Sequence, residues 1–328
     1  IQAAINAANA NYKILVAPGT YNENLTINKE VQVIGAKAGV LVDADGRGTD
    51  ESIIGGKVTI SAAATLDGFT LTKPESSTST NNINFSGWGG INLDIGSQGT
   101  VTHTIVEAYG AAGGFAGSGF VRIVDGGGTF QFSKVEAGTG YDAPNDARGV
   151  GAVAVGGVNG TYTVTENTLL VSTDNADAVN IYGGLNNTVV VTNNTISGTD
   201  GGIVEFSFNA TTGADNLTIT GNIISNYNDN GIRVFNHNKP AIVTIKDNSV
   251  TGPNPLLVDT NSTTTYVIGN SAAAALTSTS QLSSILADNA GIETLEAGSY
   301  ASFVPQNFTI DGLTVIAAYI GNNAPNTL

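Results

Sequence analysis

The sequence predicts an all-β fold, a single-stranded right-handed parallel β-helix in which successive coils of the chain stack on one another. Five asparagines follow short β-branched runs, in VTEN, VTNN, ITGN, IKDN and VIGN, at Asn167, Asn194, Asn222, Asn248 and Asn270. Their spacings of 27, 28, 26 and 22 residues match one coil of a solenoid. With 42 glycines and only 12% charged residues among 328, the composition suits tight turns and close-packed strands. We expect one stacked body over 1–275 and a C-terminal cap and tail over 276–328.

The recurring asparagine predicts the corner of each coil. Asparagine tolerates the left-handed backbone region and can hydrogen-bond locally, so stacked coils should align the amides in a column, each donating to the next. Aligning the earlier coils on their strands places Phe69, His103 and Ser133 at the same corner and predicts about eight or nine coils. The longer early spacings predict protruding loops over 73–82, 109–119 and 138–149.

The first residues predict an N-terminal cap. Apolar residues recur at helical spacing in a short segment, at Ile1, Ala4, Ile5 and Ala8. A helix laid across the first coil would cover apolar edges that otherwise favour end-to-end aggregation. The runs KILVAP, LTIN and VQVIGA then read as strands, divided at Pro18-Gly19 and at Asn28-Lys29.

A second family of strands follows the corners, in AVNIY, GIVEFSF and GIRVF. Aligning Val179, Ile203 and Ile232 places three aromatic residues in one column, which we interpret as ordinary packing; they are Tyr182, Phe206 and Phe235. After Asn270 the pattern changes. STSQLSSILADNAGI predicts a C-terminal cap helix with Ser280 as its N-cap. The apolar run FVPQNFTIDGLTVIAAYIG predicts a strand-rich tail, which is a candidate assembly element.

The opening segments carry a resemblance to a known family. IQAAINAA, followed by APGTYNENLTINK, VQVIGA and SIIGGKVTISAAATLDGFTLT, resembles the cap and first coils of the pectin-lyase-like parallel β-helix proteins. That family includes polysaccharide lyases, pectin methylesterases, hydrolases and non-enzymatic surface proteins, so the fold does not choose the function. GTYNE resembles a stretch of the methylesterases, but the esterase catalytic motifs have no counterpart here.

Charge and cysteine content limit the partners. Lys and Arg total 12 against 27 Asp and Glu, a formal charge of −15, which disfavours nucleic-acid binding. No stretch approaches the roughly 20 apolar residues of a membrane span, so membrane insertion is not expected. The absence of cysteine is compatible with an exported bacterial protein.

The resemblance to pectate-lyase-like members implies an arginine or lysine base and acidic calcium ligands. The set nearest to this pattern lies on the second strand family: Asp177, Glu205, Asp229, Arg233, His237 and Lys239. Strands of neighbouring coils lie about 4.8 Å apart, so equivalent positions could converge. The competing interpretation, which we favour, is a structural ion pair between Arg233 and Glu205 across two coils.

One acidic loop has the composition of an oxygen-only calcium site. In DADGRGTDE the candidate ligands are Asp43, Asp45, Asp50 and Glu51, although Arg47 lies among them and a solvated loop fits equally well. Calcium is therefore the one cofactor considered. The only histidines are His103 and His237, which excludes a histidine-rich metal site; at a turn, His103 reads as a hydrogen-bonding substitute for asparagine.

Two functions remain. The first is a non-enzymatic bacterial extracellular or cell-surface protein, such as a surface-layer, filament or adhesin component that associates with itself or with other surface proteins, with calcium assisting. The alternative is a polysaccharide lyase that cleaves an acidic glycan by β-elimination. The scarcity of cationic residues favours the first.

Overall fold

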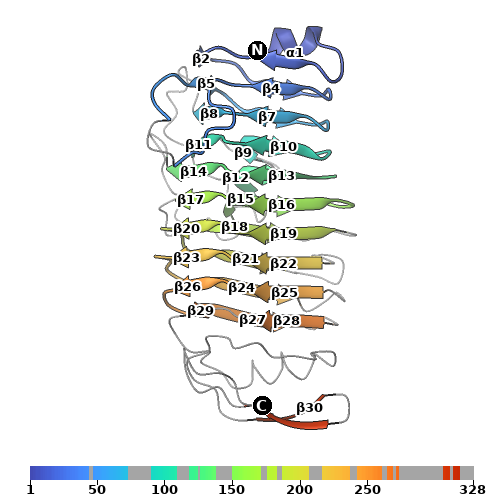
Figure 1. Ribbon diagram of the computed structural model, residues 1–328, viewed down its shortest axis with the longest axis vertical. Coiled ribbons are helices and arrows are strands. Elements are labelled where there is room, and N and C mark those ends of the chain that lie inside the picture. The colour runs from blue at the N-terminus through green and yellow to red at the C-terminus, as the bar shows by residue number, and fades with distance from the viewer. Residues whose placement is uncertain are drawn as a thin grey trace.

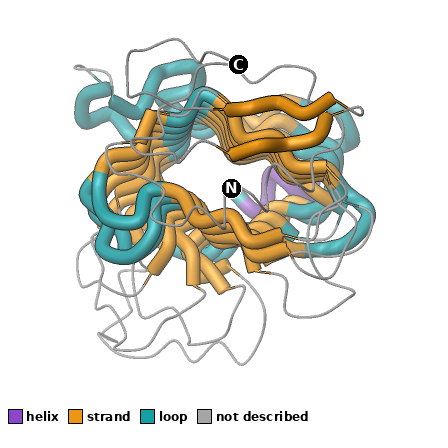
Figure 2. Tube along the Cα trace, turned by 90° about the horizontal axis from the view of Figure 1, so that it is seen from below, coloured by secondary structure: helices purple, strands orange, loops and turns teal. Residues whose placement is uncertain are grey.

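The computed structural model is a right-handed parallel β-helix, in which every third strand returns to the same sheet (Figure 1). It describes residues 1–43, 47–72, 90–108, 118–124, 126–137, 150–170, 176–182, 187–206, 216–236, 242–260, 264–268, 271–272, 306–310 and 313–317. Seen along its long axis, the coils superpose as three stacks of strands around one interior (Figure 2). The predicted fold class is confirmed.

The three parallel sheets are called A, B and C in the order in which each coil enters them. Sheet A contains β1 (Lys13–Leu15), β4 (Gln32–Ile34), β7 (Thr65–Asp67), β10 (Gly99–Thr102), β13 (Gly127–Gln131), β16 (Thr161–Thr165), β19 (Thr188–Thr192), β22 (Asn216–Thr220), β25 (Ile242–Lys246) and β28 (Thr264–Ile268). Sheet B contains β2 (Gly19–Tyr21), β5 (Ser52–Gly55), β8 (Phe69–Thr72), β11 (Ile105–Ala108), β14 (Lys134–Ala137), β17 (Thr168–Leu170), β20 (Thr195–Ser197), β23 (Ile223–Ser225), β26 (Ser249–Thr251) and β29 (Ser271–Ala272). Sheet C contains β3 (Leu25–Ile27), β6 (Val58–Ile60), β9 (Gly90–Ile95), β12 (Ser118–Ile123), β15 (Val150–Gly156), β18 (Ala176–Tyr182), β21 (Ile203–Phe206), β24 (Ile232–Asn236) and β27 (Leu256–Thr260).

The core is a set of apolar columns that run along the solenoid. Side chains alternate between the two faces of a strand, and the inward position of sheet A is filled on successive coils by fully buried residues: Val33, Leu66, Val101, Phe130, Val164, Val191, Ile219 and Ile245. The outward neighbours on the same strands are mostly threonine. The core therefore fixes the register of the strands, and the identity of the outward residues is free to vary.

The asparagine column is confirmed at the corner between sheets A and B. The side-chain Nδ2 of Asn167 donates to Oδ1 of Asn194 at 3.0 Å, Asn194 donates to Asn222 at 2.9 Å, and Asn222 donates to Asn248 at 2.9 Å. Each Oδ1 also accepts the backbone N–H of the preceding asparagine at 3.0 Å. Asn270, the fifth predicted member, lies outside the described residues.

Two details of the predicted corner are wrong. The left-handed backbone belongs to the residue before each column asparagine, as at Glu166 and Asn193, because the asparagine itself points into the buried interior. For the same reason Thr104, and not His103, occupies the column: its N–H donates to Ser133 Oγ at 3.1 Å, while His103 takes the left-handed position at φ 46°. On the preceding coil the equivalent position is occupied by Phe69, which is also fully buried.

The N-terminal cap is confirmed as α1 (Gln2–Ala7), with Ile5 fully buried and Ala8 nearly so. Ala4, expected on the apolar face, is exposed. A break between strands does lie at Pro18, after β1 ends at Leu15, but Gly19 begins a further strand, β2, which pairs with β5. Sheet A has ten described strands, more than the eight or nine coils expected, because β1 and β4 precede the first corner that the sequence alignment reached.

Several expectations fall outside the described residues. These are most of the three predicted loops and the C-terminal cap helix that begins near Ser278. The tail does contain strands: β30 (Gln306–Ile310) and β31 (Leu313–Ala317) form a two-stranded antiparallel sheet of their own. In sheet C the predicted alignment is confirmed, since Tyr182, Phe206 and Phe235 are register partners on adjacent strands.

Candidate functional site

The outer face of sheet C carries the main candidate site. Its outward column contains Asp94, Arg122, Ala154, Asn180, Val204 and Arg233, each the register partner of the next. The inward column beside it contains Ile95, Ile123, Val155, Ile181, Glu205 and Val234. Charged and amide groups are thus gathered on one outer face of an otherwise sparsely charged chain.

The register separates two of the predicted lyase residues. Arg233 is opposite Val204 on the outward column, whereas Glu205 is opposite Val234 on the inward column and is fully buried. Side chains one residue apart on a strand point to opposite faces of the sheet. Glu205 therefore lies on the inward side of the sheet and Arg233 on the outward side, and the ion pair between them stays a prediction.

Asp177, Asp229 and Arg233 remain together. Arg233 Nη1 lies 3.9 Å from Asp229 Oδ2, a loose pair with the Asp229 side chain 54% exposed. The charges of Asp229, Arg233 and Asp200 act electrostatically on the Asp177 carboxyl. His237 and Lys239 lie outside the described residues.

Asp177 has a strongly altered environment. Burial raises the pKa of its carboxyl from 3.8 to about 7, with the nearby carboxylates of Asp200 and Asp229 adding to the rise; the Asn180 hydrogen bond and the Arg233 charge oppose it. Asn180 Nδ2 donates to Asp177 Oδ2 at 2.7 Å, and Asn180 itself is fully buried. A carboxyl that titrates near neutrality can both take and give a proton at physiological pH.

Glycine makes room for this carboxyl. A Cβ at Gly201, on the next coil, would lie 2.4 Å from Asp177 Oδ1, so any larger residue there would displace the carboxylate. A Cβ at Gly151 would lie 3.0 Å from the Cβ of Asn180. The sequence analysis missed Asn180 and Asp200, although Asn180 immediately follows Val179 in the alignment and its outward position could have been read from that alignment.

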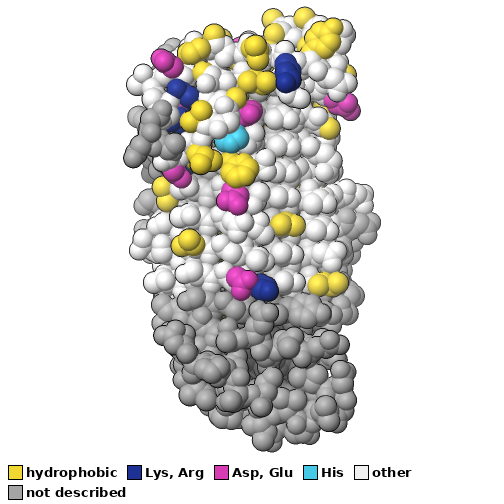
Figure 3. All heavy atoms as spheres, in the orientation of Figure 1, with side chains coloured by type: hydrophobic (Ala, Val, Ile, Leu, Met, Phe, Trp, Pro, Cys, Tyr) yellow, Lys and Arg dark blue, Asp and Glu magenta, His cyan; other side chains and the backbone are white. Residues whose placement is uncertain are grey.

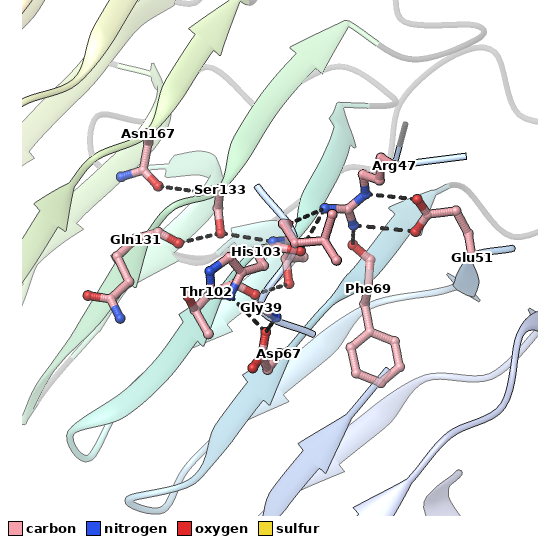
Figure 4. Close-up of polar contacts among 12 residues, drawn as sticks. Gly39, Arg47, Glu51, Asp67, Phe69, Thr102, His103, Gln131, Ser133 and Asn167 are labelled. Atoms are coloured by element: carbon pink, nitrogen blue, oxygen red, sulfur yellow. Dashed lines mark hydrogen bonds and ion pairs between the residues drawn. The ribbon is translucent and has the colours of Figure 1, made fainter. Parts of the chain in front are cut away.

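The acidic loop has a different arrangement from the one its composition indicates. Arg47 is 6% exposed and pairs with Glu51, with Nε 2.8 Å from Oε1 and Nη2 3.3 Å from Oε2 (Figure 4). Its other donors reach the backbone carbonyls of Phe69 at 3.1 Å and His103 at 3.0 Å. The guanidinium thus fastens the loop to the corners of two coils, and Glu51 is its counter-ion.

The remaining candidate calcium ligands are spread along this loop. Asp43 accepts a hydrogen bond from Thr168, Asp50 is exposed, and Asp45 lies outside the described residues. Among the residues that the structure describes, no three His, Cys, Asp or Glu side chains are grouped to hold a metal ion. The calcium site stays a prediction.

His103 has the contacts of a turn residue. Its Nδ1 lies 2.9 Å from Asp67 Oδ1 and 3.0 Å from Thr102 Oγ1 (Figure 4). Its ring also stacks on Phe132, with 5.5 Å between the ring centroids. Ser133 Oγ, the nearest column hydroxyl, donates to the Gln131 carbonyl and accepts the Thr104 N–H. These contacts support the interpretation of His103 as a hydrogen-bonding residue of the corner.

Comparisons with protein-family models, curated proteins and solved structures find no match to this chain. The resemblance to pectin-lyase-like proteins therefore stays a prediction that depends on the segments quoted above. In the described part of the chain, no helix has the length and apolar character required to cross a membrane.

Proposed function

We propose that this chain is a bacterial extracellular surface component, a stacked rod that self-associates through its C-terminal tail with calcium as an accessory cation. The observation that carries the proposal is the hairpin of β30 and β31, which forms a sheet separate from sheets A, B and C. A two-stranded hairpin is marginally stable in water. Among the described residues, neither edge of this sheet pairs with another strand, so pairing with a second molecule would stabilise it.

The rod supports this role. Ten strands in sheet A, at about 4.8 Å per step, give a stack about 43 Å long. The acidic, cysteine-free composition fits an exported location. Surface partners other than this chain would pair with the edges of the same hairpin, β30 and β31.

The test is the state of association of the full chain. Light scattering after size exclusion, with and without calcium, should reveal oligomers that Thr309→Pro dissociates, because Thr309 pairs with Thr314 within the hairpin and proline removes a backbone donor. Asn323→Pro, in the same tail but outside both strands, is the matched control and should leave the oligomers intact. A monodisperse monomer under every condition would refute self-association.

A second candidate, a polysaccharide lyase, is favoured by Asp177. A carboxyl with a pKa of about 7 beside Arg233 could remove the proton next to a uronate carboxylate while the guanidinium neutralises the developing charge. Incubation with pectate and alginate, monitored by absorbance of the unsaturated product, tests it. If the wild type has no lyase activity, or if Arg233→Ala and Asp177→Asn leave that activity unchanged, the lyase candidate is refuted.

A further inference from the structure

The outer face of sheet A carries a regular array of threonines. At the middle outward position, successive strands carry Thr65, Thr100, Thr129, Thr163, Val190, Thr218 and Thr244. Two residues further along, the column contains Asp67, Thr102, Gln131, Thr165, Thr192, Thr220 and Lys246. A third column adds Thr161 and Thr188. We call the outward side chains of β10, β13, β16, β19 and β22 the threonine face.

The array is most regular on sheet A. All three sheets offer exposed strand positions that favour β-branched residues, and sheet B also carries outward threonines, at Thr168, Thr195 and Thr251, but they alternate with other residues: Glu107, Lys134, Glu136, Leu170 and Ile223. The outward column of sheet C contains Asp94, Arg122 and Arg233. Strand propensity enriches threonine on sheet B as well, but only sheet A keeps it over successive coils.

The backbone sets the spacing of the array. Neighbouring strands lie about 4.8 Å apart and alternate residues about 6.6 Å apart, so the threonine side chains occupy a nearly rectangular net. The β-branched side chain is stiff, so each threonine adopts few rotamers. Thr192 Oγ1 donates to Thr165 Oγ1 at 2.9 Å, so these two hydroxyls lean toward each other and lie closer than the spacing of about 4.8 Å between their strands.

The face is also nearly free of charge. Figure 3 looks onto it, and across β10 to β22 it shows hardly any hydrophobic, basic or acidic side chain. A charged ligand finds no complement there. Sugar-binding platforms use aromatic rings, but no outward side chain on these five strands is aromatic.

The size of the face argues against a second copy as its partner. The five strands and up to three columns of the face cover about 19 Å by about 13 Å, roughly 250 Å². A specific protein interface buries about 800 Å² on each partner. What fits a small, rigid, neutral net of hydroxyl and methyl groups is another ordered lattice with a similar repeat.

We infer that the threonine face binds the surface of ice. Along the solenoid axis, the spacing of the net is near one repeat of the water molecules on a prism face of hexagonal ice, so hydroxyl groups of successive coils can join the lattice while the methyl groups fit between its oxygens. The inference goes beyond the proposed function and is independent of it, because an isolated monomer presents the complete face.

The test measures inhibition of ice recrystallisation and the shaping of single ice crystals by the full chain. The wild type should do both, and Thr163→Lys/Thr218→Lys should lose both. The matched control is Thr195→Lys/Thr251→Lys, at exposed outward positions of sheet B, and it should retain full activity. Thermal unfolding confirms that each variant is folded, and Thr163→Ser/Thr218→Ser, which keeps the hydroxyls, distinguishes lost fit from lost folding by retaining part of the activity.

Three results would overturn the inference. The first is a wild-type protein that has no effect on ice. The second is an equal loss of ice activity in the sheet A and sheet B variants. The third is a threonine face that binds a polysaccharide and does not bind ice. None of them bears on association through β30 and β31, which is measured separately.

Discussion

Replacing Asn194 with alanine tests the corner column directly. Its side chain is 1% exposed and makes four hydrogen bonds: it accepts from Asn167 N and Nδ2, both at 3.0 Å, and donates to Val164 O at 3.0 Å and Asn222 Oδ1 at 2.9 Å. Truncation deprives two buried backbone groups, the Asn167 N–H and the Val164 carbonyl, of this partner. At about 1–3 kcal/mol for each unsatisfied group, the loss is about 2–6 kcal/mol.

The assay is urea unfolding followed by circular dichroism, with hydrogen exchange to locate the opening. Coils of a solenoid contact only their neighbours, so exchange should increase first in the coils that contain Asn167, Asn194 and Asn222. Asn216→Ala, at an exposed position, is the control and should change the unfolding free energy by no more than about 0.5 kcal/mol. Asn194→Ser should be milder than alanine, because Ser133 already serves this position with an accepting and donating hydroxyl. If Asn194→Ala were as mild as the control, the column would not stabilise the fold.

Three further predictions concern other sites. Asp177→Asn should gain stability relative to the wild type as pH rises from about 4 to about 7, by at most about 4 kcal/mol. The reason is that the raised pKa of Asp177 makes the native wild type hold a proton that its unfolded chain has released. If the two proteins gave parallel curves of unfolding free energy against pH, this reasoning would be contradicted. Arg47→Ala should cost about 3–5 kcal/mol in urea unfolding, since it leaves Glu51 without its buried counter-ion, and Arg47→Met/Glu51→Met should recover much of the loss. Gly68→Ala should lower the melting temperature strongly, because φ is +79° and the new Cβ would lie 2.0 Å from Ala38 N; an unchanged melting temperature would mean that the loop moves aside freely.

The features that could be predicted from the sequence are those set by the buried interior. The column asparagines, the alternation of Val164 and Val191 with threonine, and the cap residue Ile5 all follow from burial and from the repeat. The prediction was wrong where two neighbouring residues competed for one position: VTHTI allows either His103 or Thr104 at the corner, and the register of Ile105 with Thr70 places Thr104 there. For Glu205, the alignment of Ile203 with Ile232 already placed the side chain on the inward side of sheet C, opposite Val234.

The candidate site was harder to predict for a related reason. Asp177 was identified, but its altered pKa depends on burial and on Asp200, which comes from the next coil and has no fixed sequence distance from it. Arg47 was read as an obstacle to calcium binding, whereas its contacts with Phe69 and His103 link a loop to coils that follow it. These contacts between coils involve residues outside the repeat, so the spacing of the repeat does not predict them.

Function in this fold must be sought on the outward positions, because the inward positions are constrained by packing. The same backbone presents three outer faces with three chemistries: a neutral threonine net on sheet A, mixed side chains on sheet B, and paired charges on sheet C. Since a change of outward residue costs little stability, a face that keeps one residue type over many coils, as sheet A does from Thr65 to Thr244 with Val190 as the interruption, requires a reason beyond folding. The buried asparagine column at the edge of that sheet holds successive coils in register, and a flat surface net can match a crystal lattice only if the register is constant. Weakening the column with Asn194→Ala should therefore reduce ice shaping at temperatures where the chain is still folded. If the threonines had no role beyond folding, Asn194→Ala would not change ice shaping at those temperatures.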